Sequence, residues 1–315
     1  MTPADRPRVA VVGVGSVGGY FGAMAAIAGC EVLLCPRRPF DELVVLTDGE
    51  RLVADATVLS GEPAAEEVGP VDWVLLATKA HQTAGVAGWL KALSGSGTVV
   101  VVLQNGVDHL ERVASLTGDA EVLPAIVKYG GELLEPGVVR HHTYGYLTVP
   151  ESPTGARLAE LFAPAGVEVK LTAAFDTAAW TKLATNVIAN AIPALTMRRF
   201  DVFRRDDIAG VAEQVVAECV AVASAVGVRL PRSLPTTEVT RLASLPDGVG
   251  SSMLYDRLAG RTTEHETLNG AVVRMGAQHG VPTPLNAALT AMLAAISDSA
   301  RPTDATPPPD HPPHR

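Results

Sequence analysis

The chain has 315 residues, which is enough for two domains with hydrophobic cores of their own. Hydrophobic residues make up 47% of it and charged residues 19%, a composition typical of a folded protein rather than a disordered one. The formal net charge of −9 argues against nucleic acid or an anionic membrane surface as a partner.

Short runs rich in Val and Leu alternate with helical patterns through the first half of the chain. Such alternation is typical of an α/β domain with a parallel sheet, here over residues 1–173. GVVRHHTYGYLTV (137–149) predicts an antiparallel edge or hairpin, and GVEVKLT (166–172) a last strand. We expect helices near 18–28, 80–93 and 107–116, and buried strands at RVAVVG (8–13), EVLLC (31–35), DWVLLAT (72–78), TVVVVL (98–103) and AEVLPA (120–125).

The segment GVGSVG directly follows the first predicted strand and opens the first predicted helix. In its G-x-G-x-x-G spacing, Gly13 permits a tight turn, Gly15 admits a pyrophosphate, and Gly18 lets the helix pack on the strand. The helix N-terminus then faces the phosphates. The alternative is a plain glycine-rich turn. We predict a Rossmann-type dinucleotide site formed by Gly13, Val14, Gly15, Ser16, Val17 and Gly18.

The second predicted strand ends in CPRR, where a domain specific for NAD carries an acid for the ribose hydroxyls. Arg37 and Arg38 stand there instead. A guanidinium group suits the 2′-phosphate of NADP, which an acid would repel. The sequence therefore favours NADP as the cofactor. The alternative is a pair of solvated loop arginines.

Polar residues follow two further predicted strands. Lys79 comes after the strand at 72–78, and Gln104 and Asn105 come after the strand at 98–103. Ligands of open α/β sheets bind at the carboxyl ends of the strands. Lys79 is therefore a candidate cofactor contact, against an ordinary lysine at a helix start. Asn105 is a second candidate, although Asn-Gly also makes a good turn.

From about Phe175 onward the strand pattern stops. We expect an all-helical domain over 174–300, and a cleft between the two domains is where a ligand is expected. The Pro-rich end, 301–315, is predicted to be disordered, and its two histidines are not expected to hold a metal. The helices are expected at about 176–197, 206–226, 236–245, 264–279 and 284–297.

The first of these helices contains WTKLATNVIAN, in which Lys182, Asn186 and Asn190 recur every four residues and share one face. A solvated face is usually built from Glu, Lys and Arg, whereas this face has a single charge. Asn also costs about 0.6 kcal/mol relative to Ala inside a helix. The composition alone leaves both a solvated face and a face that lines a ligand cleft open, and the motifs in the rest of the chain favour the cleft-lining face.

The segment SSMLYDRLAGRTTEHETLNG contains Ser252 and a helix start. Thr263 with Glu266 three residues later predicts a capping box, with Thr263 as the N-cap of the helix at 264–279. Glu264, at the first helical position, is not needed for that box. His279 lies on the predicted apolar face of this helix, so we expect it to be half-buried packing and not a ligand.

Together these segments resemble the ketopantoate reductase (2-dehydropantoate 2-reductase) family over about residues 8–297. The resemblance implies NADPH-dependent reduction of a 2-oxo acid. It also implies a Rossmann-type domain followed by a helical domain of the 6-phosphogluconate dehydrogenase type, commonly in a dimer. It is carried by GVGSVG, the arginine at position 37, TKA, QNG, KLATNVIAN and SSM…RTTEHETLNG.

The resemblance also implies a role for each matching residue. Lys182 is the proton donor, and Glu264 orders the arrangement of cofactor and substrate. The glycine loop, Arg37 and Lys79 bind NADP, while Asn105 contacts both nicotinamide and substrate. The remaining substrate contacts come from Asn186, Asn190 and Ser252.

The segment LTMRRFDVF, Leu195 to Phe203, lacks the Asn-Gly pair with which better-known members of the family help to hold the substrate. A related reductase that acts on another 2-oxo acid or carbonyl compound is therefore an alternative to ketopantoate reduction. A non-catalytic NADP-binding regulator is a second alternative, although a regulator has no use for a proton donor.

The start of the sequence, MTPADRPRVAVVGVG, lacks the features of an export signal, and no apolar run approaches the roughly 18 residues of a spanning helix. Cys30, Cys35 and Cys219 have no metal-binding spacing and cannot all pair. Buried, unpaired thiols suit a reducing compartment. We expect a cytoplasmic homodimer with no membrane or nucleic-acid partner and no metal.

Overall fold

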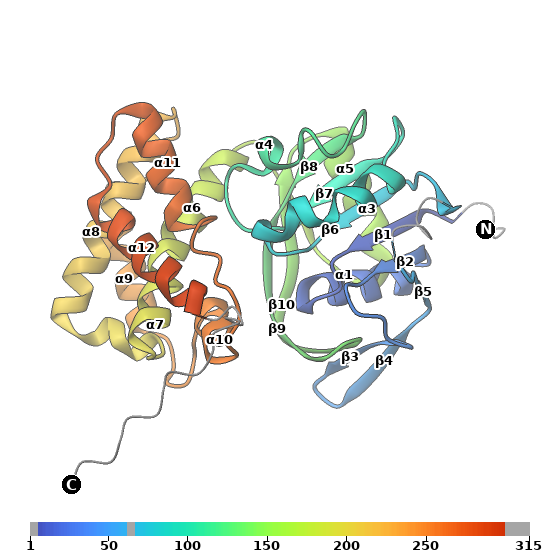
Figure 1. The fold of residues 1–315 in the computed structure, drawn as a ribbon, viewed down its shortest axis with the longest axis horizontal. Coiled ribbons are helices and arrows are strands. Elements are labelled where there is room, and N and C mark those ends of the chain that lie inside the picture. The colour runs from blue at the N-terminus through green and yellow to red at the C-terminus, as the bar shows by residue number, and fades with distance from the viewer. Residues whose placement is uncertain (1–5, 62–66, 300–315) are drawn as a thin grey trace, which may run out of the picture. The chain divides into compact units, whose positions relative to one another are not determined.

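The computed structural model describes residues 6–61 and 67–299, which form two compact units (Figure 1). The first unit extends to Ala184 and also includes Ala223–Leu230. The second comprises Thr185–Val222 and the chain from Pro231 onward. The segment 301–315, for which we predict disorder, lies outside the described residues. The predicted class, an α/β domain followed by a helical domain, is confirmed.

The centre of the first unit is a six-stranded sheet in which all neighbouring strands are parallel (Figure 1). Its strands are β1 (Arg8–Val12), β2 (Glu31–Cys35), β5 (Ala56–Val58), β6 (Trp73–Leu76), β7 (Val99–Val102) and β8 (Glu121–Pro124). They lie in the order β5-β2-β1-β6-β7-β8, so the direction of winding changes between β1 and β6. In open α/β sheets, ligands bind at the carboxyl ends of the strands beside this change.

Alternate side chains of each strand pack on opposite faces of this sheet. Val9 and Val11 of β1 belong to one apolar cluster, together with helix α1 (Ser16–Ile27). Ala10 and Val12, the alternate residues of β1, belong to the other cluster, together with α3 (Ala87–Leu93). Because both faces are buried, the strands are continuous apolar runs rather than alternating ones.

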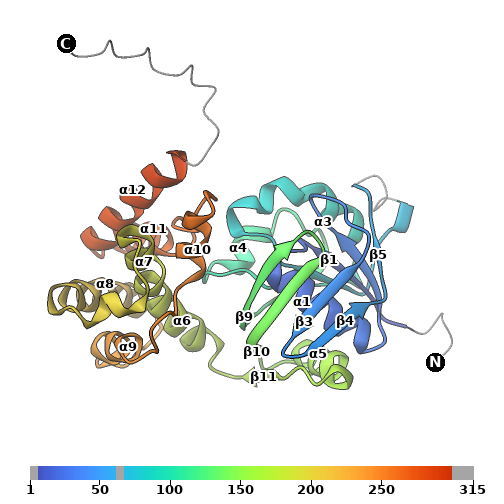
Figure 2. The same cartoon turned by 90° about the horizontal axis from the view of Figure 1, so that it is seen from below.

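A second sheet packs against α1 (Figure 2). Its strand order is β11-β10-β3-β4, and β9 pairs antiparallel with β10 as a hairpin. Strand β10 covers nearly all of the segment 137–149, for which the sequence predicts an antiparallel edge or hairpin. Helix α1 contacts strands of both sheets and so forms the layer between them. The strands are β3 (Leu43–Thr47), β4 (Glu50–Ala54), β9 (Ile126–Glu135), β10 (Val138–Pro150) and β11 (Val169–Thr172).

The structure differs from the sequence prediction in several elements of this unit. Strands β3, β4, β5 and β9 and helix α5 (Pro153–Phe162) were not predicted. The helix expected at 80–93 begins as a 3-10 segment, η2 (Ala80–Val86), in which the Thr83 hydroxyl donates to the Ala80 carbonyl oxygen at 2.8 Å. Such a bond competes with the helical hydrogen-bond pattern. The helix expected at 107–116 is only the short α4 (His109–Val113).

Helices build the second unit. Helix α6 (Phe175–Ala189) begins in the first unit and ends in the second. It is followed by α7 (Ala191–Thr196), α8 (Asp206–Ala225), α9 (Leu234–Ala243), α10 (Ser252–Leu258), α11 (Asn269–His279) and α12 (Pro284–Ser299).

The helix predicted for 176–197 is interrupted at Asn190. Pro193 explains the interruption, because it has no N–H to donate to the Ala189 carbonyl four residues earlier. Its ring would also clash with that carbonyl in a continuous helix. Asn190 therefore lies between two helices, with a φ of −97° and a ψ of −51°.

Helix α8 is the one described helix that is long and apolar enough, by length and composition alone, to cross a membrane. Its side chains Val215, Val216 and Cys219 are buried. Its Glu218 carboxylate accepts the backbone N–H groups of Leu285 and Asn286 at 2.9 Å each, at the start of α12. One face of α8 therefore packs within the protein.

Candidate active site

Three glycines shape the loop between β1 and α1. Gly13 has a φ of +97°, and a Cβ there would lie 2.6 Å from the Thr78 backbone nitrogen. A Cβ on Gly18 would lie 2.1 Å from the Gly13 carbonyl oxygen. A Cβ on Gly15, in contrast, would meet nothing within 4 Å. The open space at Gly15, beside the N-terminus of α1, fits a dinucleotide pyrophosphate.

Arg37 and Arg38 follow β2, and both side chains are exposed. The Gly13 N–H donates to the Cys35 carbonyl oxygen at 3.2 Å, which fixes the end of β2 beside the glycine loop. Neither arginine forms an ion pair with a carboxylate among the described residues. The two guanidinium groups are therefore available to an anion bound at this end of the sheet.

Gln104 joins the carboxyl ends of β6 and β7. Its buried side chain donates from Nε2 to Thr78 Oγ1 at 3.0 Å and to Thr83 Oγ1 at 2.8 Å. Thr78 in turn lies against Gly13. Lys79 is half-buried at the start of η2, directly after Thr78. These hydrogen bonds join the carboxyl ends of β6 and β7 beside two of the predicted cofactor residues, Gly13 and Lys79.

Lys182 reaches this edge from α6. Its Nζ donates to Asn105 Oδ1 at 3.1 Å and to the Val127 carbonyl oxygen at 2.9 Å. Asn105 comes after β7, and Val127 belongs to β9. The side chain of Lys182 is half-buried. The ammonium group is therefore held by backbone and amide oxygens at the end of the sheet, and is not turned toward bulk solvent.

Two residues of α4 hold the turn at Gln104 and Asn105. Arg112 donates from Nη1 to Gln104 Oε1 at 2.9 Å and to the Asn105 carbonyl oxygen at 3.1 Å, and it pairs with Asp108. His109 Nε2 lies 3.0 Å from the Gln104 carbonyl oxygen. Burial lowers the pKa of His109 to about 4, so at neutral pH the ring is uncharged and donates to this carbonyl.

Neither His109 nor Arg112 was predicted from the sequence to belong to the site. The one signal in the sequence was the i, i+4 spacing of Asp108 and Arg112 in a predicted helix, which indicates an ion pair but not its neighbours.

In the second unit, Asn190 and Ser252 lie together. Asn190 Oδ1 accepts hydrogen bonds from Ser252 Oγ and from the Met253 N–H, both at 3.3 Å. Asn190 Nδ2 donates to the Asn186 carbonyl oxygen at 3.3 Å. Asn190 is buried, Asn186 is half-buried, and Ser252 is exposed as the first residue of α10. The predicted substrate residues of this unit thus form one group.

Glu264 is buried, but it does not lie in a helix. Helix α11 begins only at Asn269. Before it the chain forms turns in which the Glu264 carbonyl oxygen accepts the N–H groups of Thr267 and Leu268 at 3.1 and 3.2 Å. The predicted helix start at 264 is therefore wrong, because these turns replace its first helical residues.

The predicted capping box is wrong for the same reason. Thr263 Oγ1 lies 2.9 Å from Ser297 Oγ of α12 instead of capping a helix. Glu266 is exposed and pairs with Arg274 at 3.4 Å. His279 is exposed as the last residue of α11, so the predicted half-buried packing is also wrong.

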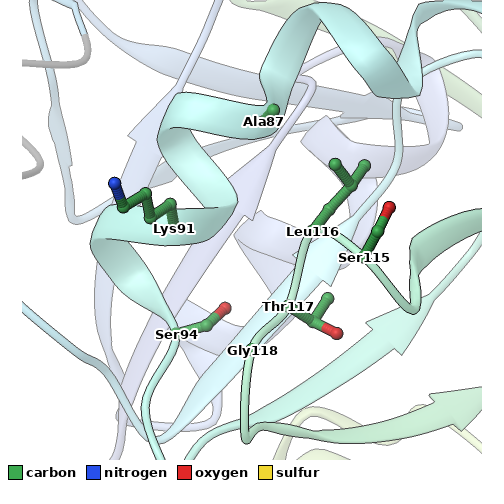
Figure 3. Close-up of a pocket in the computed structure, with 7 residues that line it drawn as sticks. All are labelled: Ala87, Lys91, Ser94, Ser115, Leu116, Thr117 and Gly118. Carbon is green, nitrogen blue, oxygen red and sulfur yellow. The ribbon is translucent and has the colours of Figure 1, made fainter.

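A cavity of about 320 Å³ lies elsewhere in the first unit (Figure 3). It opens between α3 and the chain after α4, and the segments that follow these two helices lead into the amino ends of β7 and β8. It shares no residue with the groups described above. Its lining residues are Ala87, Lys91, Ser94, Ser115, Leu116, Thr117 and Gly118.

Two sequence models of one family match the chain. Ketopantoate reductase PanE/ApbA matches residues 9–154, and Ketopantoate reductase PanE/ApbA C terminal matches residues 174–297. The 2-dehydropantoate 2-reductase of Mycobacterium tuberculosis is 40% identical over 92% of this chain and 98% of its own length. The chain belongs to the ketopantoate reductase family.

Other members of the ketopantoate reductase family are similarly close. The 2-dehydropantoate 2-reductase of Caulobacter vibrioides is 36% identical over 92% of this chain and 99% of its own length. The crystal structure of a ketopantoate reductase from Ralstonia eutropha JMP134 has a TM-score of 0.85, with 34% identity over 93% of this chain and 99% of that one. The resemblance noted in the sequence is confirmed. The family consists of oxidoreductases that use a nicotinamide dinucleotide.

Proposed function

We propose that the protein reduces 2-dehydropantoate (ketopantoate) to pantoate with NADPH and that Lys182 donates the proton. The position of the Lys182 ammonium group carries the proposal, because Asn105 and the Val127 carbonyl oxygen hold it at the carboxyl edge of the dinucleotide-binding sheet. The choice of ketopantoate as the substrate is supported by relatives named 2-dehydropantoate 2-reductase, which are 40% and 36% identical to this chain.

The residues around the glycine loop fit the cofactor. Gly15 gives the pyrophosphate room to approach the backbone, and the N-terminus of α1 favours its charge. Arg37 binds the 2′-phosphate as a guanidinium fork, and Lys79 adds a second positive charge at the end of β6. When bound, NADPH supplies the hydride that attacks the ketone carbon.

Negative charge develops on the ketone oxygen during the reaction. The Lys182 ammonium group stabilises that charge and passes a proton to the oxygen, so that the product is an alcohol. Asn105 Oδ1 accepts from Nζ, which orients the ammonium group without competing for its proton. General acids placed in this way contribute about 10²- to 10⁴-fold to a rate.

The remaining substrate contacts are amides and a hydroxyl. Asn186, Asn190 and Ser252 bind the hydroxyl and carboxylate of the substrate without adding a negative charge that would repel it. Buried Glu264 orders the cofactor and substrate relative to each other. We expect the enzyme to act as a homodimer in the cytoplasm, where its three cysteines, which are free and buried, remain reduced.

The test is the Lys182→Ala variant. We expect kcat with ketopantoate to fall by about 10²- to 10⁴-fold, while the Kd for NADPH changes by less than about threefold. Lys91→Ala, which removes an exposed lysine of α3, is the control and should keep wild-type kinetics. Near-wild-type turnover in Lys182→Ala would show that another group is the acid.

Substrate identity is tested separately, because Leu195–Phe203 departs from the better-known members of the family. We expect ketopantoate to give the highest kcat/KM in a panel of 2-oxo acids. A higher value for another acid would identify a different reductase. NADPH binding without oxidation by any acid would identify a regulator.

A further inference from the structure

The turn that carries Asn105 is held from outside the sheet by Arg112 of α4. We propose that Arg112 is a positioning residue for the proton donor, because it fixes this turn so that Asn105 Oδ1 holds the Lys182 ammonium group. The inference rests on the proposed function, since it requires Lys182 to be the acid. Arg112 itself touches neither Lys182 nor the reacting atoms.

The contacts of Arg112 converge on one short segment. Nη1 donates to both Gln104 Oε1, at 2.9 Å, and the Asn105 carbonyl oxygen, at 3.1 Å. Nη2 pairs with Asp108, which neutralises the guanidinium charge near the active-site edge. The Arg112 side chain is only 11% exposed, so water screens these bonds little. One planar group thus fixes a side chain and a backbone carbonyl of adjacent residues.

The two residues held by Arg112 depend on it to different degrees. Gln104 also donates to Thr78 and Thr83, so its side chain keeps two hydrogen bonds when Arg112 is removed. The Asn105 carbonyl loses a charged donor, and the next residue, Gly106, has a φ of +111° and little resistance to rotation. Loss of Arg112 therefore removes a charged donor from the residue that holds Lys182, while the side chain of Gln104 keeps its bonds to the cofactor strands.

A matched pair of variants tests this. Arg204 of η4 (Phe200–Arg204) also holds two backbone carbonyls and a carboxylate, those of Ala243, Leu245 and Asp247, in the helical unit. Arg112→Met should lower kcat about 10- to 100-fold, the scale expected for a misplacement of about 1 Å, with less than about threefold change in the KM for NADPH. Arg204→Met should keep wild-type kcat, and Arg112→Lys should fall between wild type and Arg112→Met.

The decisive measurement is a double-mutant cycle with Lys182→Ala. If Arg112 acts through Lys182, Arg112→Met changes the residual kcat of Lys182→Ala by less than about threefold. Losses that multiply, or an unchanged kcat in Arg112→Met, would overturn the inference while the proposed acid stands. Full turnover in Lys182→Ala would overturn both. Should Arg112→Met not fold, the same cycle is run with Arg112→Lys.

Discussion

Under the proposed function, the exposed arginines at the end of β2 give the protein its preference for NADPH over NADH. A charge-assisted hydrogen bond contributes about 1.5–3 kcal/mol, which corresponds to about 10- to 100-fold in affinity. We therefore expect Arg37→Ala to raise the KM for NADPH by that factor and to leave the KM for NADH unchanged. Steady-state kinetics with both cofactors measure the effect.

Arg38→Ala is the matched comparison for this prediction, because Arg38 is the next residue in the chain, has the same charge and is also exposed. We expect it to affect NADPH less than Arg37→Ala does. An unchanged KM for NADPH in both variants, or an equal loss for NADH, would show that these arginines do not read the 2′-phosphate.

His109 links the stability of the turn before α4 to pH. Burial lowers its pKa to about 4 from the ordinary value of 6.5, so the unfolded chain binds a proton that the folded chain does not. The contribution of His109 to stability is thus fully present above pH 6.5 and is lost as pH falls toward 4. Between pH 7 and pH 5 the loss amounts to about 2 kcal/mol.

The His109→Gln variant isolates this contribution. Gln can still donate to the Gln104 carbonyl, but it does not titrate. Urea unfolding should therefore show that, from pH 7 to pH 5, the wild type loses about 2 kcal/mol more of its free energy of unfolding than the variant does. Parallel pH profiles would contradict the assignment of a neutral, buried ring.

At the scale of an element, we expect two glycines of the loop between β1 and α1 to have different roles, Gly18 in packing and Gly15 in ligand binding. Gly18→Ala would place a Cβ 2.1 Å from the Gly13 carbonyl oxygen, so we expect a loss of stability of about 1–3 kcal/mol or more. Gly15→Ala would place its Cβ in open space, at a φ of −90° that any residue adopts. It should melt like wild type but bind NADPH about tenfold more weakly or worse.

Thermal melts and NADPH titrations of both variants measure this difference. Tight NADPH binding by Gly15→Ala would mean that the cofactor does not approach the backbone there. A Gly18→Ala variant as stable as wild type would mean that β1 and α1 can move apart.

Elements governed by local chemistry were predictable from the sequence. The glycine spacing and the apolar runs predicted β1, α1 and the other buried parallel strands. A strand that is buried on both faces is a continuous apolar run, which can be recognised without knowing its neighbours in the sheet. Strands β3 and β4 were missed although they pair with each other as a hairpin, and Asp48-Gly49 between them was the local turn signal in the sequence. Pro193 held the information for the break after α6, but the helical pattern around it outweighed that signal.

At the scale of the whole molecule, the residues of the candidate site could be predicted from the sequence. The contacts that hold these residues in place could not. Lys182, Asn105 and the glycine loop stood out by spacing and by their position after predicted strands. The contact between Lys182 and Val127 depends on β9, which was not predicted, and the role of Arg112 depends on the fold of α4. The Thr263–Glu266 pattern misled because a local capping signal competes with tertiary contacts such as that of Thr263 with Ser297.

Two helices, α6 and α8, each have residues in both units. Helix α6 continues from Trp180 and Lys182 in the first unit through Asn186 in the second. Unfolding of either unit therefore removes part of a helix from the other, and we expect the whole chain to unfold in a single cooperative transition. The tryptophans allow a test, because all three, Trp73, Trp89 and Trp180, belong to the first unit.

A ligand of the first unit should then stabilise the whole chain. NADP⁺ at about 100 times its Kd stabilises the native state by about 2.7 kcal/mol, which raises Tm by about 4 °C when the whole chain unfolds in one transition. Tryptophan fluorescence reports on the first unit, and far-UV circular dichroism also reports on the helices of the second. We expect both transitions to rise together in wild type and to rise by about half as much or less in Gly15→Ala. A dichroism transition that stays in place while the fluorescence transition moves would show that the units unfold independently despite the shared helices.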